Sequence, residues 1–172
     1  MRRMKLRSLL ALTAFLTMSL FSSAEPLAVG ATAPQVTGVT ETGAALVLAE
    51  VYAQQPYTLV YFYPKADTPG CTAQGCSLRD GYEALLKAGV AVIGVSTDNP
   101  EAQKAFKEKY RLPFTLIADD SKTVVKAFGV PTTMGFAKRQ AFLIKGGKII
   151  WADYSASTKQ QADDVLNVIA AQ

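Results

Sequence analysis

The hydrophobic pattern of the chain alternates between short apolar runs and longer amphipathic stretches. Runs rich in β-branched and aromatic residues are typical of buried strands, whereas an apolar period of 3.6 residues is typical of helices. On this basis we predict strands at Thr58–Tyr63, Val90–Ser96 and Phe114–Ala118. The helices that we predict after them are Cys71–Ala88, Pro100–Tyr110 and Ser121–Phe128.

Further elements are predicted on both sides of this βαβαβα core. Short apolar stretches and turn residues within 28–51 indicate an N-terminal β-hairpin. A second hairpin is predicted from Arg139–Ile144 and Lys148–Tyr154 around Gly146-Gly147, and a last helix from Ser157 or Thr158. This order favours an α/β class with a thioredoxin-like fold, in which helices flank a central mixed sheet and an N-terminal β-hairpin precedes it.

The first 24 residues have the layout of a secretory signal peptide. Four basic residues within 1–7 precede the uncharged apolar stretch Leu9–Phe21, and small residues end at Ala24, before Glu25. The apolar stretch is shorter than the roughly 20 residues that a membrane-spanning helix needs. We therefore predict cleavage after Ala24 rather than a retained anchor, export to the periplasm, and a single domain over 25–172.

Removal of that segment changes the charge balance of the chain. Four of the 18 Lys and Arg residues lie within it, which leaves 14 basic residues against 14 acidic ones. The formal net charge of residues 25–172 is therefore zero, and we expect neither nucleic acid nor an anionic membrane as a partner.

The types of residue present also limit the chemistry. The chain has no histidine, which excludes Ser-His-Asp and Cys-His catalysis and any His-ligated metal site. Its two cysteines are too few for an all-Cys zinc or iron–sulfur site. We expect a protein without metal or cofactor, and any catalysis must rest on Cys, Arg, Thr, carboxylates or the backbone.

Both cysteines lie in one segment that directly follows the first predicted strand. Pro64 and Pro69 interrupt regular structure there, so Cys71 is expected at or near a helix N-terminus. Backbone N–H groups and the helix dipole favour negative charge at that position, and the thiol should ionise more easily. Thr68 could hydrogen-bond to the sulfur or to a substrate oxygen, or it could simply cap the helix.

Cys71 and Cys76 in an exported chain are most simply explained as a structural disulfide. However, residues five apart on a regular helix have Cα atoms roughly 8.6 Å apart, which is too far for a disulfide. The bond could form only if the start of the helix unwound, and such a bond suits a redox switch better than a permanent crosslink. The residues alone leave both interpretations open.

The cysteine segment closely resembles the peroxiredoxins. Their signature of Pro, three residues, Thr or Ser, two residues and Cys is met by Pro64, Thr68 and Cys71. A second cysteine five residues later, Cys76, is similar to the peroxiredoxin Q, or bacterioferritin comigratory protein, branch. The resemblance continues through Val95–Asp98, Phe114–Leu116, Phe128–Val130 and Arg139–Ile144, and it covers nearly all of the chain from about Val29.

This resemblance implies a thiol-dependent peroxidase that reduces hydrogen peroxide and small organic hydroperoxides. It assigns Cys71 as the peroxidatic cysteine, which becomes a sulfenic acid, and Cys76 as the resolving cysteine, which then forms an intramolecular disulfide with it. It also assigns Arg139 to stabilise the thiolate and hold a peroxide oxygen, and Pro64 to shape the loop and shield the sulfur. Without it, Arg139 would be interpreted as an ordinary charge at a strand end.

The resemblance further implies an external dithiol reductant, similar to thioredoxin, and we expect a monomer. Two alternatives remain. An exported thioredoxin-fold thiol–disulfide oxidoreductase would normally carry Cys-x-x-Cys, whereas four residues separate the cysteines here. A non-catalytic exported domain with a structural disulfide would consume no peroxide.

Overall fold

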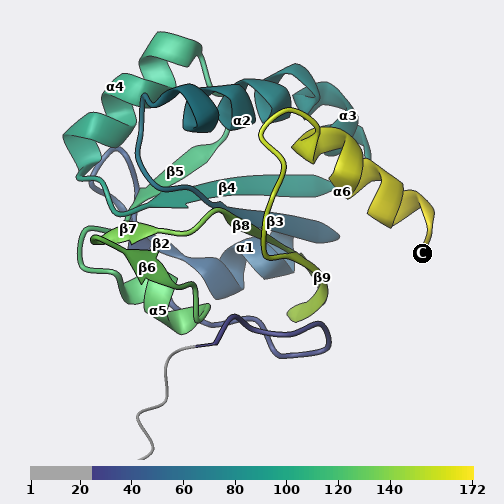
Figure 1. The fold of residues 1–172 in the computed structure, drawn as a ribbon. Coiled ribbons are helices and arrows are strands. Elements are labelled where there is room, and N and C mark those ends of the chain that lie inside the picture. Colours follow the sequence, from purple (N-terminus) through teal and green to yellow (C-terminus); the bar gives the residue numbers. More distant parts are fainter. Residues whose placement is uncertain (1–24) are drawn as a thin grey trace, which may run out of the picture.

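A five-stranded mixed sheet forms the centre of the computed structural model, which describes residues 25–172 (Figure 1). Across the sheet the strands are β5 (Thr115–Ala118), β4 (Val90–Ser96), β3 (Tyr57–Phe62), β8 (Gln140–Lys145) and β9 (Lys148–Asp153). The three strands on the β5 side are parallel, whereas β8 is antiparallel to both of its neighbours. The predicted signal peptide lies outside the described residues.

Helices cover both faces of this sheet. They are α1 (Leu48–Gln54), α2 (Pro69–Asp80), α3 (Tyr82–Lys87), α4 (Pro100–Tyr110), α5 (Thr123–Ala127) and α6 (Gln161–Ala170). Figure 1 shows α2, α3, α4 and α6 on one face, and α1 and α5 on the other. Two short hairpins complete the fold: β1 (Thr37–Val39) with β2 (Ala45–Val47), and β6 (Thr132–Thr133) with β7 (Phe136–Ala137). None of the helices within 25–172 is long and apolar enough to cross a membrane.

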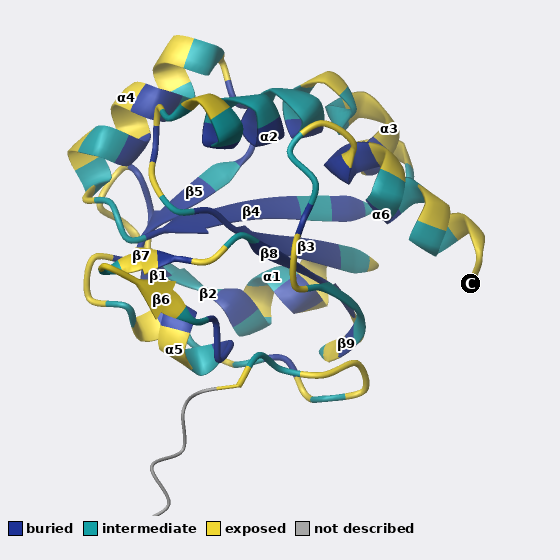
Figure 2. Cartoon of the chain, in the orientation of Figure 1, coloured by how far each residue is buried: buried dark blue, intermediate teal, exposed yellow. Residues whose placement is uncertain are grey.

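Strand β3 separates two hydrophobic cores (Figure 2). Leu59, Tyr61 and the following Tyr63 belong to the core beneath α2, α4 and α6, whereas Val60 and Phe62 belong to the core on the side of α1 and α5. A strand that is buried on both faces has a continuous apolar run in its sequence, and this run is what predicted β3. The end of this strand leads into the segment that carries both cysteines.

The predicted α/β fold with a thioredoxin-like mixed sheet and an N-terminal hairpin is confirmed. The bounds of β4 and α4 agree with the prediction, and Asn99 caps α4 by accepting a hydrogen bond from the Ala102 amide at 2.9 Å.

The helices differ from the prediction in four details. Helix α5 begins at Thr123 and not at Ser121, because Lys122 before it has a left-handed backbone. The helix expected over 71–88 is two helices that break at Gly81, whose added Cβ would lie 2.6 Å from the Ala162 Cβ. Helix α1 was not predicted. The last helix begins at Gln161, because the Ser157 hydroxyl instead accepts hydrogen bonds from the amides of Lys159 and Gln160 in a preceding turn.

Candidate active site

The loop between β3 and α2 is fixed by contacts at two points. The Ala66 amide donates to the Asp98 carboxylate at 2.7 Å. Asp67 has a left-handed backbone with a φ of 57° and accepts hydrogen bonds from Lys109 and from the Tyr110 hydroxyl. These bonds, chiefly the one from Lys109, lower the pKa of Asp67. The loop is thus held against the end of β4 and the end of α4.

Cys71 lies in the first turn of α2, as the sequence predicts. Pro69 occupies the first helical position, where its missing N–H costs nothing. The Cys71 side chain is buried, with 2% of its surface exposed, and its thiol is free. The unpaired amides and the dipole of this helix end favour a negative charge on groups placed here.

Arg139 lies just before β8, and its guanidinium reaches the cysteine. Its Nη2 donates to the Cys71 Sγ at 3.4 Å, and its Nη1 donates to the Gln74 Oε1. An added Cβ on Gly70 would lie 3.2 Å from the same Nη2, so the guanidinium packs closely against this glycine. The structure therefore brings the Arg139 guanidinium and the Cys71 sulfur together across 68 residues of sequence.

Thr68 and Pro64 lie in the loop between β3 and α2, and the Thr68 hydroxyl bonds to the backbone rather than to the sulfur. Thr68 precedes α2 at the N-cap position, but its hydroxyl donates to the Lys65 carbonyl at 3.0 Å and caps no amide of the helix. Pro64 is half-buried just after the buried Tyr63. Thr68 is thus the N-cap residue of α2 by position, as one alternative expected, but its hydroxyl bonds within the preceding turn and makes no side-chain cap.

Cys76 lies on the same helix as Cys71, about 1.4 turns later. It is half-buried, and its thiol is also free. Because α2 is continuous from Pro69 to Asp80, the two Cα atoms are separated by roughly 8.6 Å. A disulfide cannot span that distance, so the two sulfurs can meet only if α2 partly unwinds.

Gln74 is a site residue that the sequence reasoning missed. It is fully buried on the face of α2 that also carries Cys71 and Leu78. Its Oε1 accepts from Arg139 and its Nε2 donates to the Gln161 Oε1 at 2.7 Å. The available signal was a polar residue three positions after Cys71, on the stripe that helical spacing turns toward the core.

Two buried tyrosines lie beneath the thiol site. Tyr61 and Tyr63 stack with their ring centroids 5.5 Å apart. Burial raises the pKa of both phenols, so neither is a base at neutral pH. Tyr63 donates its hydroxyl proton to the Gln103 Oε1, whereas the Tyr61 hydroxyl has no hydrogen-bond partner within residues 25–172.

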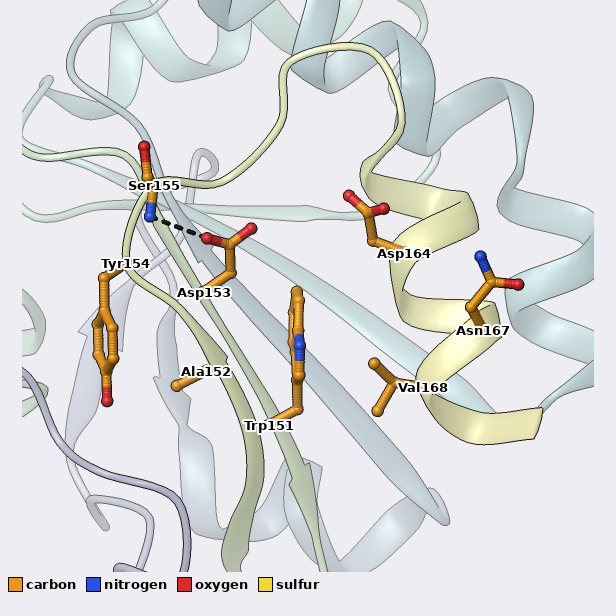
Figure 3. Close-up of a pocket in the computed structure, with 8 residues that line it drawn as sticks. All are labelled: Trp151, Ala152, Asp153, Tyr154, Ser155, Asp164, Asn167 and Val168. Atoms are coloured by element: carbon orange, nitrogen blue, oxygen red, sulfur yellow. Dashed lines mark hydrogen bonds between the residues drawn. The ribbon is translucent and has the colours of Figure 1, made fainter. Parts of the chain in front are cut away.

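A separate hollow of about 610 Å³ lies between β9 and α6 (Figure 3). Figure 3 shows the Trp151 ring between the strand and the helix, with Asp153 on one side and Asp164 and Asn167 on the other. Burial, followed by the charge of Asp153, raises the pKa of Asp164. None of the sequence-predicted site residues lines this hollow, so it is distinct from the thiol site.

Comparisons with known proteins agree with the geometry at Cys71. A model of the AhpC/TSA family matches residues 29–152. The chain is 42% identical over 150 residues to Peroxiredoxin Bcp of Escherichia coli K12. This match covers 83% of the chain and 95% of that protein. It is also 45% identical over 105 residues to the chloroplastic Peroxiredoxin Q of Populus jackii, covering 61% of this chain and 48% of that protein.

The fold is similar to that of a solved bacterioferritin comigratory protein. That structure, from Xanthomonas campestris, is described together with its alkyl peroxide reduction activity. The similarity has a TM-score of 0.73 at 27% identity, and it covers 84% of this chain and 96% of that one. By contrast, the chain spans only about half the length of the chloroplastic relatives that it matches.

Proposed function

Because the chain belongs to the AhpC/TSA family, in its peroxiredoxin Q/Bcp branch, we propose that it is a thiol-dependent peroxidase that reduces hydrogen peroxide and small organic hydroperoxides. The observation that carries the proposal is the contact between the Arg139 guanidinium and the Cys71 sulfur in the first turn of α2. There the helix end and a fixed cation both stabilise a thiolate, which is the form of cysteine that acts as nucleophile.

The first step is attack of the Cys71 thiolate on one peroxide oxygen. The O–O bond breaks, the sulfur becomes a sulfenic acid, and the other oxygen leaves with a proton as water or an alcohol. Arg139 has a planar fork of donors, so it can hold a peroxide oxygen while keeping its contact with the sulfur. In this proposal the Thr68 hydroxyl turns from the Lys65 carbonyl toward the same oxygen, and Pro64 shields the sulfur from bulk water.

The second step returns the sulfur to the thiol state through Cys76. The Cys76 thiolate attacks the Cys71 sulfenic acid, a disulfide forms, and water leaves. An external dithiol then reduces the disulfide by exchange and is itself oxidised. We propose a thioredoxin-like protein as that donor and a monomer as the working form.

The two alternative functions explain less of the site. A thiol–disulfide oxidoreductase with Cys-x-x-Cys would place its cysteines within one helical turn of each other, whereas here five positions separate them. A structural disulfide is at odds with two free thiols on one continuous helix. Neither alternative requires Arg139 at the sulfur.

The test is rapid mixing of the reduced protein with hydrogen peroxide while free thiols are counted. The wild-type protein should lose two thiols per peroxide, whereas Cys71→Ser should keep its remaining thiol, because Cys76 lies beyond the first turn of α2, where the helix end no longer favours a thiolate. Slow thiol loss in the wild type, at the rate of a free cysteine in water, would disprove the peroxidase.

We also propose that the mature protein works in the periplasm after cleavage behind Ala24. The support is the basic, apolar and small-residue layout of the first 24 residues. The intact mass of the protein from a periplasmic extract should correspond to a chain that begins at Glu25. A full-length mass in the cytosolic fraction would contradict export.

A further inference from the structure

Three side chains from distant parts of the chain form a buried hydrogen-bonded row behind the thiol. Gln161, at the start of α6, accepts from the Gln74 Nε2 at 2.7 Å, and the Gln74 Oε1 accepts from the Arg139 Nη1. Both glutamine side chains are buried, with at most 1% of their surface exposed. The row therefore runs from α6 through α2 to the guanidinium whose other Nη atom contacts Cys71.

The chemistry of the donors fixes the direction of this row. Arginine carries only donors, so Gln74 must present its oxygen to Arg139 and its NH₂ group to the far side. A buried NH₂ group needs an acceptor, and the Gln161 oxygen is the acceptor that it meets. If the Gln74 amide turned over, its NH₂ group would face the donors of Arg139 and the contact would be lost.

Gln161 supplies the acceptor for the Gln74 NH₂ group, but its own NH₂ group is left without a partner. Its own Nε2 is buried and finds no hydrogen-bond partner among residues 25–172. An unsatisfied buried donor costs free energy in the folded state, so packing alone would favour an apolar residue at the start of α6. The amide at position 161 is thus explained by the orientation that it imposes on Gln74.

We propose that Gln161 is a positioning residue of the thiol site. It holds the Gln74 amide with its oxygen toward Arg139, and Arg139 is in turn held with Nη2 against the Cys71 sulfur. This inference rests on the proposed function, and it adds to it a residue 90 positions away from Cys71 that touches neither cysteine nor peroxide.

The first test is Gln161→Leu, which removes the acceptor and keeps most of the volume. The second-order rate constant of Cys71 with hydrogen peroxide should fall about tenfold or more, because misplacement of a catalytic group carries a cost of that order. Gln161→Glu keeps an acceptor for the Gln74 amide and should retain most of the wild-type rate. Val165→Ala loosens the packing of α6 one turn further along but removes no polar group of the row, so it should leave the rate unchanged.

The decisive test repeats Gln161→Leu in a Gln74→Glu background. A carboxylate has two equivalent oxygens and always presents one of them to Arg139, so it needs no partner to orient it. If Gln161 acts through the orientation of Gln74, its loss should now change the rate less than twofold. An equal loss in both backgrounds would show that Gln161 only supports the packing of α6, and a Gln161→Leu rate within twofold of the wild type would also overturn the proposal.

A readout that does not depend on peroxidase activity separates the two claims. The rate at which iodoacetamide alkylates Cys71 can be measured by peptide mass mapping, and it also depends on the guanidinium beside the sulfur. Gln161→Leu should therefore change this alkylation rate. If the wild type ignores peroxide but this change is present, the proposed function fails and the positioning role stands. If Gln161→Leu does not fold by circular dichroism, Gln161→Met replaces it with the same expected outcomes.

Discussion

Arg139 contacts the Cys71 sulfur with one Nη atom and the Gln74 oxygen with the other. Replacement by alanine removes both the charge and the donor, so we expect the rate with peroxide to fall by about a hundredfold, the usual cost of one aligned donor at a reacting oxygen. Arg139→Lys restores a charge without the planar fork and should remain well below the wild-type rate. Stopped-flow kinetics would check both values, and a full rescue by lysine would mean that only the charge matters.

The two buried tyrosines give a matched pair for a prediction on stability. Tyr61→Phe removes a buried hydroxyl without a partner in the described chain, and it should stabilise the fold by about 1 kcal/mol. Tyr63→Phe leaves the buried Gln103 oxygen without its donor and should destabilise the fold by about 1–2 kcal/mol. Urea unfolding of both variants would measure the difference, and equal effects would show that the two hydroxyls have equivalent surroundings.

At the scale of single residues, the sequence predicts site residues that lie close together in the chain better than those brought together by long-range contacts. Pro64, Thr68, Cys71 and Cys76 lie within 13 residues, so their spacing alone placed them on one loop and one helix end. Arg139 reaches the sulfur only because β8 pairs with β3, and its role came from the family resemblance. Gln74 and Gln161 carried no motif, because a buried amide is recognised by its partners in space.

In the proposed cycle, helix α2 must change its structure between the reduced and the disulfide form. Both cysteines lie on it, and its two flanks are tied to the end of α4. Asp67 receives hydrogen bonds from Lys109 and Tyr110, and Arg79 donates to the Tyr110 carbonyl at 2.9 Å. These ties bracket the segment from Thr68 to Leu78, so the unwinding that joins the sulfurs can stay local.

Gly75 is the position where the stability of α2 can be changed most simply. An added Cβ would lie 3.4 Å from both methyl carbons of Leu112 and 3.5 Å from Phe106, which is ordinary contact. Gly75→Ala should therefore stabilise the helix by about 1 kcal/mol. We expect slower disulfide formation after peroxide reacts, with the first reaction itself nearly unchanged.

Hydrogen exchange on reduced and oxidised protein measures the underlying motion. Amides from Cys71 to about Leu78 should lose protection on oxidation, whereas those of α6 beyond its first turn should keep it. Gly43→Ala serves as the control, because Gly43 lies in the β1–β2 turn with a φ of 82°, so an added Cβ should destabilise the fold without acting on α2 or α6. Unchanged protection of 71–78 in a verified disulfide form would refute the unwinding.

The sequence predicted elements best where one residue pattern decided them. Strand β4 is a continuous apolar run, and α4 has a proline in its first turn and an asparagine cap, so their bounds agree. The break at Gly81 depends on the close approach of Ala162 from a helix 80 residues later, which no local pattern contains. Helix α1 buries Leu48 and Tyr52 one turn apart, but its seven residues are too few for a helical period to stand out in the sequence.

In the whole molecule the sheet brings three separate parts of the chain to one place. Cys71 lies on α2, which follows the end of β3. Arg139 lies just before β8, and Gln161 is the first residue of α6. The order of elements was enough to predict this fold class, because βαβ units with a following hairpin allow few arrangements. The hollow between β9 and α6 lay outside any sequence prediction.

The measurement that tests the central claim most directly is the intact mass of the protein after one equivalent of hydrogen peroxide. The reduced wild-type protein should lose two hydrogen atoms, as a Cys71–Cys76 disulfide requires. Cys76→Ser should gain one oxygen on Cys71, and Cys71→Ser should keep its mass. Oxygen on Cys76 in the Cys71→Ser variant, with an inert Cys76→Ser variant, would reverse the assigned roles and contradict the account.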